Sequence, residues 1–218
     1  MIRTDGIACC EITCAETFPL EDPELFRFWM NRMPEERKRK VLALRHAESQ
    51  RQSLGVGILL FRAMESRGLD GARTEIQAGA YGKPFLPGYP EFCFSLSHSG
   101  NRVICAVHDH PVGCDVESFG RDLTHLARRF YHPEEQAALE ETPEDLRQML
   151  FFRLWTRKES RLKATGEGIS APMSGFSVIH PLPGIWYDDG PVFPDCAACC
   201  CVIQDERPAF HWREVSLM

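Results

Sequence analysis

The sequence lacks any long apolar run and has no surplus of basic residues. No stretch of its 218 residues approaches the roughly 20 consecutive apolar residues of a membrane-spanning helix. The N-terminus carries Asp5 and Glu11 and has no apolar core typical of a signal peptide. The formal net charge of -6 argues against general binding to nucleic acid, whose phosphate backbone attracts basic surfaces. We therefore expect a cytoplasmic protein without membrane or nucleic-acid partners.

A second pair of zinc-ligating cysteines is also missing. The chain has ten cysteines, and Cys196 and Cys199 form a C-x-x-C pair. No second pair at finger-like spacing follows, which disfavours a structural zinc site. The segment 199–203 instead predicts a buried strand in which cysteine packs as a small apolar residue. A disulfide framework is not expected in a chain of this size without secretion signals, so we predict mostly reduced thiols.

The order of the predicted elements suggests two halves of similar composition. Periodicity and end signals predict strand, helices and strands, followed by the same order again. The predicted strands are 7–13, 92–96, 103–107, 112–117, 199–203 and 210–215, and the predicted helices are 23–30, 34–42, 47–66, 123–130, 133–141 and 143–165. The Pro- and Gly-rich stretch 181–194 is expected to be irregular. The predicted fold class is α+β, with residues 1–110 and 111–218 as the two halves.

An acidic pair, Asp115 and Glu117 in G-C-D-V-E, is the most informative local feature. Successive side chains of a strand point to opposite faces, so these two carboxylates share one face. Like charges on one face repel, and a cation between them relieves that repulsion. Mg²⁺ is the natural candidate, because it takes hard oxygen ligands and combines carboxylates with substrate phosphates.

A third carboxylate, Glu159, lies on the longest predicted helix. That helix is expected to have Thr142 as its N-cap and to end at Gly166. Glu159 and Lys163 are four residues apart, and such pairs are usually solvated surface pairs. Phe152, Trp155 and Thr156 lie on the same side of the helix and indicate an inward Glu159 instead. The helix alone leaves both interpretations open.

Several donors suited to phosphate oxygens occur outside the acidic motifs. Lys83 lies in a stiff G-K-P loop, and Ser97 and His98 end a predicted strand. Adjacent strand residues point apart, so Ser97 and His98 do not form a nucleophile–base pair, and no G-x-S-x-G motif is present. The basic residues of the early helices are either solvated or clamp a phosphate; they are Arg37, Lys38, Arg39, Lys40, Arg45 and Arg51. The residues predict a Mg²⁺-dependent enzyme acting on a phosphate ester or anhydride, without naming its substrate.

Five motifs follow one another along the chain. They are G-K-P from Gly82, S-L-S-H-S-G from Ser95, P-V-G-C-D-V-E from Pro111, R-R-F-Y-H-P-E-E from Arg128, and L-W-T-R-K-E-S-R-L-K-A-T-G-E-G-I-S from Leu154. In this order and spacing they resemble the 4′-phosphopantetheinyl transferases, and together they are specific, whereas D-x-E alone is weak. The length is similar to the surfactin-synthetase-activating (Sfp) type, whose members are single-chain pseudodimers of two similar α/β halves. The short holo-acyl-carrier-protein synthases, about half this size, assemble as trimers instead.

The resemblance implies transfer of the phosphopantetheine arm of coenzyme A to a serine of an acyl or peptidyl carrier protein, with 3′,5′-ADP as the second product. It implies that Asp115, Glu117 and Glu159 bind Mg²⁺, which bridges the pyrophosphate. Lys163 is expected to bind the same pyrophosphate. Glu159 is the expected base for the serine proton, directly or through water. A monomer is expected.

The resemblance also implies contacts to the coenzyme A phosphates. His98 with Ser97 is expected to contact these phosphates, Lys83 and Arg51 to lie near the adenosine 3′-phosphate, and Arg39 to assist them. The chain departs from its relatives at two positions. Glu36 replaces a basic residue of the early helix, and Ser95 replaces a frequent asparagine. Arg128 and Arg129 could steer an acidic carrier protein, or cover the core with their stems.

Two other functions remain open on the residues alone. A Mg²⁺-dependent phosphohydrolase or nuclease could use the same three acids, but it leaves the order of the five motifs unexplained. An inactive module that binds coenzyme A or a carrier protein would not need all three acids and Lys163. The sequence does not identify the carrier protein, because such discrimination depends on surface contacts.

Overall fold

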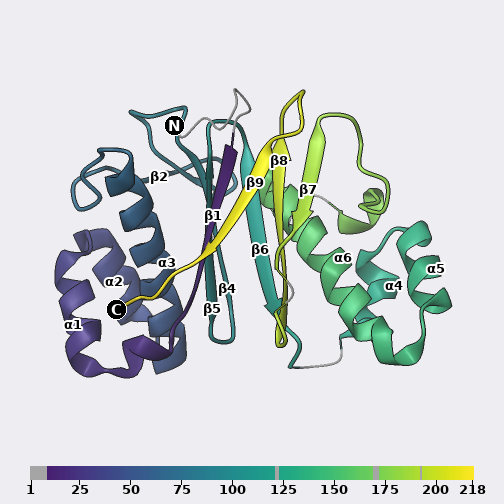
Figure 1. Cartoon of the computed structure of the whole chain (residues 1–218), viewed down its shortest axis with the longest axis horizontal. Helices are drawn as coiled ribbons and strands as arrows, with labels where there is room; N and C mark the ends of the chain where they lie inside the picture. Colours follow the sequence, from purple (N-terminus) through teal and green to yellow (C-terminus); the bar gives the residue numbers. More distant parts are fainter. Residues whose placement is uncertain (1–8, 121–122, 169–171, 192) are drawn as a thin grey trace.

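The computed structural model describes residues 9–120, 123–168, 172–191 and 193–218, and it contains two main sheets between two groups of helices (Figure 1). The first sheet has the strand order β4 (Cys93–Ser99), β5 (Arg102–His108), β1 (Cys9–Glu16) and β9 (Ala209–Glu214). The second has the order β6 (Val112–Ser118), β8 (Cys196–Ile203) and β7 (Ile185–Asp189). A two-stranded hairpin pairs β2 (Gln77–Ala78) with β3 (Pro84–Phe85). The mixed α/β composition predicted from the sequence is confirmed.

The helices cover the outer faces of the two sheets (Figure 1). On the first sheet they are α1 (Pro23–Arg32), α2 (Glu35–Ala43) and α3 (Ala47–Ser66), preceded by the 3-10 turn η1 (Phe18–Glu21). On the second they are α4 (Ala127–Phe130), α5 (Pro133–Glu141) and α6 (Glu144–Thr165), with the 3-10 turns η2 (Thr124–Leu126) and η4 (Met173–Gly175). No helix in the described ranges is both long and apolar enough to cross a bilayer.

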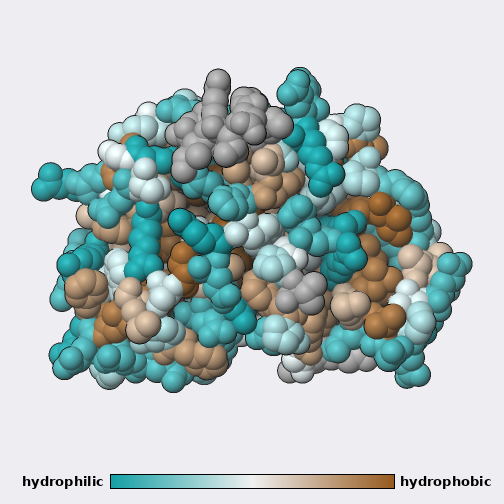
Figure 2. All heavy atoms as spheres, viewed as in Figure 1, coloured by the Kyte–Doolittle hydropathy of each residue, from teal (hydrophilic) through white to brown (hydrophobic). Residues whose placement is uncertain are grey.

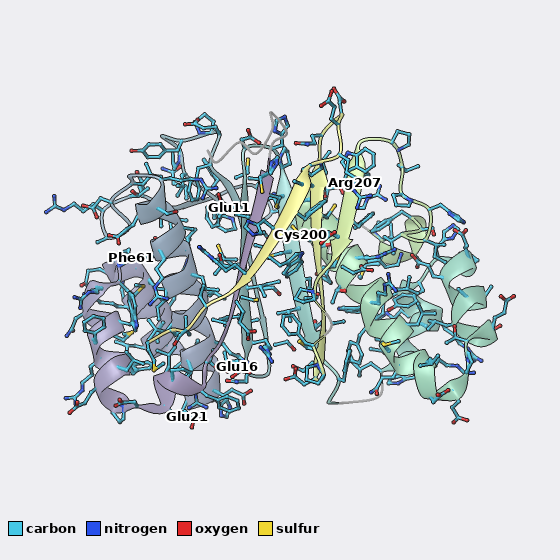
Figure 3. The ribbon with its side chains drawn as sticks, in the orientation of Figure 1. Glu11, Glu16, Glu21, Phe61, Cys200 and Arg207 are labelled. Atoms are coloured by element: carbon cyan, nitrogen blue, oxygen red, sulfur yellow. The ribbon has the colours of Figure 1, made fainter. Side chains whose placement is uncertain are left out.

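The core between the sheets is rich in cysteine. Cys10 from β1 and Cys200 from β8 are both fully buried, and their sulfurs are 3.6 Å apart. Figure 3 shows Cys200 between the sheets, with Glu11 and Glu16 toward opposite ends of β1. All ten cysteines are free thiols. The predicted buried cysteine strand is confirmed as part of β8, where sulfur packs as an apolar atom.

Strand β5 shows why this core is continuous. All seven of its residues are buried, because α3 packs near one face and the second sheet covers the other. Its sequence, R-V-I-C-A-V-H, is therefore a nearly continuous apolar run and does not alternate between polar and apolar residues. Two clusters meet at this strand: Val103 and Val107 face the helices, while Ile104 and Ala106 face the second sheet.

The last strand of the chain returns to the first half. β9 pairs in parallel with β1, with Cys10 opposite Phe210. The indole nitrogen of Trp29 on α1 donates to the carbonyl of Leu217 at 2.8 Å, and Leu217 is fully buried. Residues after 208 thus complete the sheet and core formed by the first hundred residues.

The structure corrects two local predictions. Thr142 is not the N-cap of α6; it is the C-cap of α5, its hydroxyl donates to the carbonyl of Ala138, and Pro143 takes the N-cap position of α6. The stretch 181–194, predicted to be irregular, contains β7, because pairing with β8 supplies the hydrogen bonds that its local sequence does not indicate. The predicted end of α6 is confirmed, since Gly166 has φ +77 and its N–H bonds the carbonyl of Leu162.

Candidate active site

Serine side chains join the edges of the two sheets at the predicted acidic site. Ser97 on β4 donates to Oδ1 of Asp115 at 2.8 Å, and Ser99 donates to Oε2 of Glu117 at 2.9 Å. Ser95, one further step along the same face, accepts from the backbone N–H of Cys114 at 3.0 Å. The period-2 serines of S-L-S-H-S therefore take the place of a backbone ladder between β4 and β6, and they orient both carboxylates.

Gly113 allows α6 to approach β6 closely enough to complete the site. A Cβ atom at Gly113 would lie 1.9 Å from the carbonyl oxygen of Ser160 and 2.4 Å from the backbone nitrogen of Ala164. Only glycine avoids this clash, because both of the opposing atoms belong to the backbone of α6. The close packing brings Glu159 and Lys163, on the same side of α6, against the acidic strand. The inward interpretation of this pair is the one that the structure supports.

Asp115 is the centre of the polar network. It is 3% exposed, and its Oδ1 accepts from the ammonium of Lys163 at 2.6 Å as well as from Ser97. Lys163 also donates to the hydroxyl of Ser97 at 2.9 Å. The other carboxylate oxygen, Oδ2 of Asp115, is buried and has no hydrogen-bond partner among the described residues. A buried carboxylate oxygen without a donor is a position where a cation would supply the missing interaction.

The electrostatics of the site also indicate missing positive charge. Burial, and then the charge of Asp115, raises the pKa of Glu117 to about 7. The pKa of Glu159 is raised by the same two causes. Burial by itself would lower the pKa of Lys163, but the neighbouring Asp115 outweighs burial and the pKa is raised. Three carboxylates therefore surround one ammonium, and their oxygen-only donor set fits a hard divalent cation such as Mg²⁺.

His98 follows Ser97 on β4, and its imidazole is affected by the charges of Lys163 and Asp115. Burial lowers the pKa of its imidazole, and the charge of Lys163 lowers it further, so His98 is neutral at physiological pH. The charge of Arg37 on α2 also acts on this imidazole. Arg37 packs along Gly57 of α3, where a Cβ would lie 3.2 Å from its Cδ, and burial lowers its pKa. The sequence does not distinguish Arg37 from its basic neighbours, because four consecutive basic residues show no apolar face.

Two connected cavities open beside the carboxylates. One, of about 300 Å³, is lined by Glu159, Lys163 and Lys83. The other, of about 390 Å³, is lined by Arg37, Lys40 and Arg73. Both are bordered by Gly82, Pro84, Phe94 and Leu96, so the two cavities adjoin. Glu36 and Glu75 also line the second cavity, so its wall carries charges of both signs. Figure 2 shows the mixture of polar and apolar residues over one face of the molecule.

The remaining predicted phosphate ligands lie at different distances from the acidic cluster. The ammonium of Lys83 donates to the carbonyls of Ala164, at 2.8 Å, and Val112, at 3.2 Å. Lys83 thereby connects its loop to the end of α6 and the start of β6. Arg51 pairs with Glu21 at 3.3 Å, and Arg39 is exposed on α2. Within the described part of the chain, neither arginine hydrogen bonds to the carboxylate cluster.

Comparison with known proteins identifies the family of this chain. The model of the 4′-phosphopantetheinyl transferase superfamily matches residues 111–186, which include all three acids and Lys163. The 4′-phosphopantetheinyl transferase Sfp of Bacillus subtilis (strain 168) is 36% identical over 162 residues, or 73% of this chain and 71% of that protein. A second Bacillus subtilis 4′-phosphopantetheinyl transferase is 36% identical over 66% of this chain and 64% of its own length. The 4′-phosphopantetheinyl transferase HetI of Nostoc is 38% identical over 56% and 54%, respectively. The chain therefore belongs to the 4′-phosphopantetheinyl transferase family, and to its Sfp type, as the five motifs predicted.

Proposed function

We propose that this chain transfers the 4′-phosphopantetheine group of coenzyme A to a serine of an acyl or peptidyl carrier protein, the reaction for which its family is named. The observation that carries the proposal is the buried Oδ2 of Asp115, which has no hydrogen-bond partner within the described part of the chain. Lys163 and the connected cavities lie beside it, so a cation and a phosphorylated ligand have adjacent places.

Asp115, Glu117 and Glu159 would hold the Mg²⁺. All three supply oxygen ligands, and the raised pKa values of Glu117 and Glu159 reflect negative charge that a cation would compensate. A bound Mg²⁺ would supply Lewis-acid stabilisation of charge on the pyrophosphate and on the departing 3′,5′-ADP. Ser97 and Ser99 keep the two strand carboxylates oriented through their hydrogen bonds.

The serine hydroxyl of the carrier protein would attack the phosphorus atom that bears the pantetheine arm. The new serine O–P bond forms as the bond to the leaving phosphate oxygen breaks, and 3′,5′-ADP departs with the bonding electrons. Glu159 would accept the serine proton, directly or through water, because its carboxylate lines the cavity beside Lys163 in which the phosphorylated ligand would bind. Glu117, which Ser99 orients on the same face of β6 as Asp115, is the second candidate for this role.

Four other side chains would bind the phosphates of coenzyme A. Lys163 is oriented by Asp115 and Ser97, so its third donor position remains for the pyrophosphate. His98 and Ser97 would contact phosphate oxygens from β4. Lys83, Arg51 and Arg39 are proposed for the 3′-phosphate, and for Lys83 this means exchanging backbone carbonyls for phosphate oxygens.

The chain is proposed to be a monomeric pseudodimer with halves 1–110 and 111–218. Its support is the equivalent strand order: β4-β5-β1 in the first half corresponds to β7-β8-β6 in the second, with a long helix, α3 or α6, in each. The boundary falls at the turn between β5 and β6. The last strand of the second half, β9, pairs with β1 of the first half, which favours folding of the two halves together.

The proposed partner is a transiently bound carrier protein, and the proposed location is the cytoplasm, where free cysteines such as these ten stay reduced. Arg128 and Arg129 on α4 are proposed to steer the acidic surface of that partner. The guanidinium of Arg129 lies over the ring of Phe130, at 5.1 Å from its centroid. Arg128 lines a cavity of about 440 Å³ with His125 and Arg147, so positive charge faces solvent there.

Intact-protein mass spectrometry tests the proposal. An apo carrier protein is incubated with this chain, coenzyme A and Mg²⁺, in parallel with reactions that contain EDTA or the Glu159→Ala variant. A mass gain matching phosphopantetheine that disappears in both controls supports the transfer. Hydrolysis of coenzyme A without modification of any of several carrier proteins would instead identify a phosphohydrolase. Coenzyme A binding with neither reaction would identify an inactive binding module.

A further inference from the structure

A second group of metal-ligating side chains lies at the turn between β5 and β6. It consists of His108, the last residue of β5, with Asp109 and His110. Their potential ligand atoms lie within 4.8 Å of one another, and no other group of three in the described ranges is as compact. Asp115 lies three residues beyond Val112, the start of β6, or about 10 Å further along the strand at its usual rise per residue. The two groups are therefore separate.

The distances between these donors suit one bound ion. Oδ1 of Asp109 lies 3.0 Å from Nδ1 of His108 and 3.0 Å from Nδ1 of His110. Neighbouring donors around an ion with bonds of roughly 2.0–2.2 Å are separated by about 3 Å. Two imidazoles and one carboxylate make a nitrogen-rich set, which suits zinc, copper, iron or nickel, whereas Mg²⁺ prefers oxygen.

His108 is the buried member of this group. Its residue is 2% exposed, and the backbone N–H of His110 donates to its Nδ1 at 2.9 Å. Nδ1 is therefore the ring nitrogen that carries the lone pair, and an ion bound there would replace this hydrogen bond. Nε2, on the opposite edge of the ring, is buried without a hydrogen-bond partner among the described residues.

The adjoining cavity has the charge and the size that a hydrated cation needs. Its volume is about 180 Å³, and His108 and Asp109 line it with Glu11 and Glu91. Figure 3 shows Glu11 toward the end of β1 that lies near this turn. The facing cation, Arg67, is paired with Glu11 at 3.2 Å. Three carboxylates thus face one guanidinium, and the space admits waters that would complete the coordination of an ion.

We propose that His108, Asp109 and His110 bind a divalent transition-metal ion, separately from the carboxylates of the candidate active site. Zn²⁺ is the probe ion, because neutral imidazole and carboxylate are among its common ligands. The turn that they occupy connects the two halves of the chain, and β6 with its carboxylates follows it directly. An ion that binds the folded turn and not the unfolded chain stabilises the folded protein in proportion to its concentration.

Isothermal titration with Zn²⁺ tests the site in the full chain under reducing conditions. The background is a Glu117→Gln/Glu159→Gln variant, which weakens competing binding at the active-site carboxylates. We expect this background to bind one Zn²⁺ and to melt at a higher temperature when Zn²⁺ is added. Adding His110→Ala should weaken binding by more than the about 10–100-fold that follows loss of an outer-shell partner, and it should abolish the thermal shift. Asp109→Asn should also weaken binding.

The matched control is His211→Ala, which removes an exposed histidine of β9. It should leave the Zn²⁺ affinity and the thermal shift unchanged. The side chain of His110 is 50% exposed, so its truncation should leave the fold intact, as circular dichroism can verify. Zn²⁺ binding that is absent from the background variant, or equally tight with and without His110→Ala, would overturn the proposal.

Discussion

Replacing Gly113 by alanine would test the geometry of the active site most directly. The new Cβ would lie 1.9 Å from the carbonyl oxygen of Ser160, whereas ordinary contacts begin at 3.4 Å. α6 must therefore retreat from β6 by about 1.5 Å, since the opposing atoms belong to helix backbone and have no rotamer to change. Overpacking of this kind costs about 1–3 kcal/mol of folding stability. A displacement of about 1 Å at a catalytic group can lower the rate about 100-fold.

The assay would measure kcat/KM for carrier-protein modification together with its Mg²⁺ dependence. We expect Gly113→Ala to lower kcat/KM by about 100-fold, because Glu159 moves away from Asp115 and Glu117. The variant should also need more Mg²⁺ for half-maximal activity. Gly88→Ala is the matched control, since no atom lies within 4 Å of the position that its Cβ would take. Wild-type kcat/KM and Mg²⁺ dependence in a folded Gly113→Ala variant would refute the reasoning.

Three further predictions follow from buried charges. Without divalent ions, thermal melts should show that the stability of the protein falls between about pH 5 and about pH 8. The reason is that Glu117, with a pKa of about 7, binds its proton more tightly in the folded than in the unfolded protein. Glu117→Gln should flatten this dependence of stability on pH, and an unchanged slope in that variant would contradict the prediction. Lys158→Met removes the ammonium that lies 2.8 Å from the fully buried Glu135 and leaves that carboxylate with only the backbone N–H groups of His132 and Val178 as donors. This variant should lower the free energy of unfolding by about 3–5 kcal/mol in urea denaturation, and a loss below about 1 kcal/mol would contradict the prediction. Lys83→Met should lower the free energy of unfolding by about 1–3 kcal/mol in urea denaturation, because the carbonyls of Val112 and Ala164 lose their donor. If Lys83 only bound coenzyme A, the substitution would leave stability unchanged.

The acidic pair and its glycine could be predicted locally, but the reason for the glycine could not. Alternation along a strand suffices to place Asp115 and Glu117 on one face, whatever surrounds that strand. Gly113 belongs to the same motif, yet its role depends on Ser160 and Ala164, more than forty residues away. The missing side chain of Gly113 allows α6 to pack closely against β6, and a local sequence pattern gives no information about contacts between such distant segments.

The basic run shows a different limit. Arg37 and Arg39 stand two residues apart in a stretch of charged side chains, and sequence periodicity offers no apolar face that would orient them. The structure places Arg37 half-buried beside Gly57 and leaves Arg39 exposed. Packing of α2 against α3 decides which guanidinium points toward His98 and the cavities. The sequence therefore shows that this helix carries basic residues, but it does not show which of their side chains points toward the cavities.

The order of the five motifs by itself determined the family, the acidic residues and the end of the longest helix at Gly166. Those features are local, because they depend on residue identity, on spacing and on backbone preferences over a few residues. Only the tertiary structure decided that β9 joins β1, that β7 forms in a Pro- and Gly-rich stretch, and that Oδ2 of Asp115 lacks a partner among the described residues. Each of these depends on contacts between residues distant in the chain, whose hydrogen bonds and burial come from partners that a local pattern does not specify.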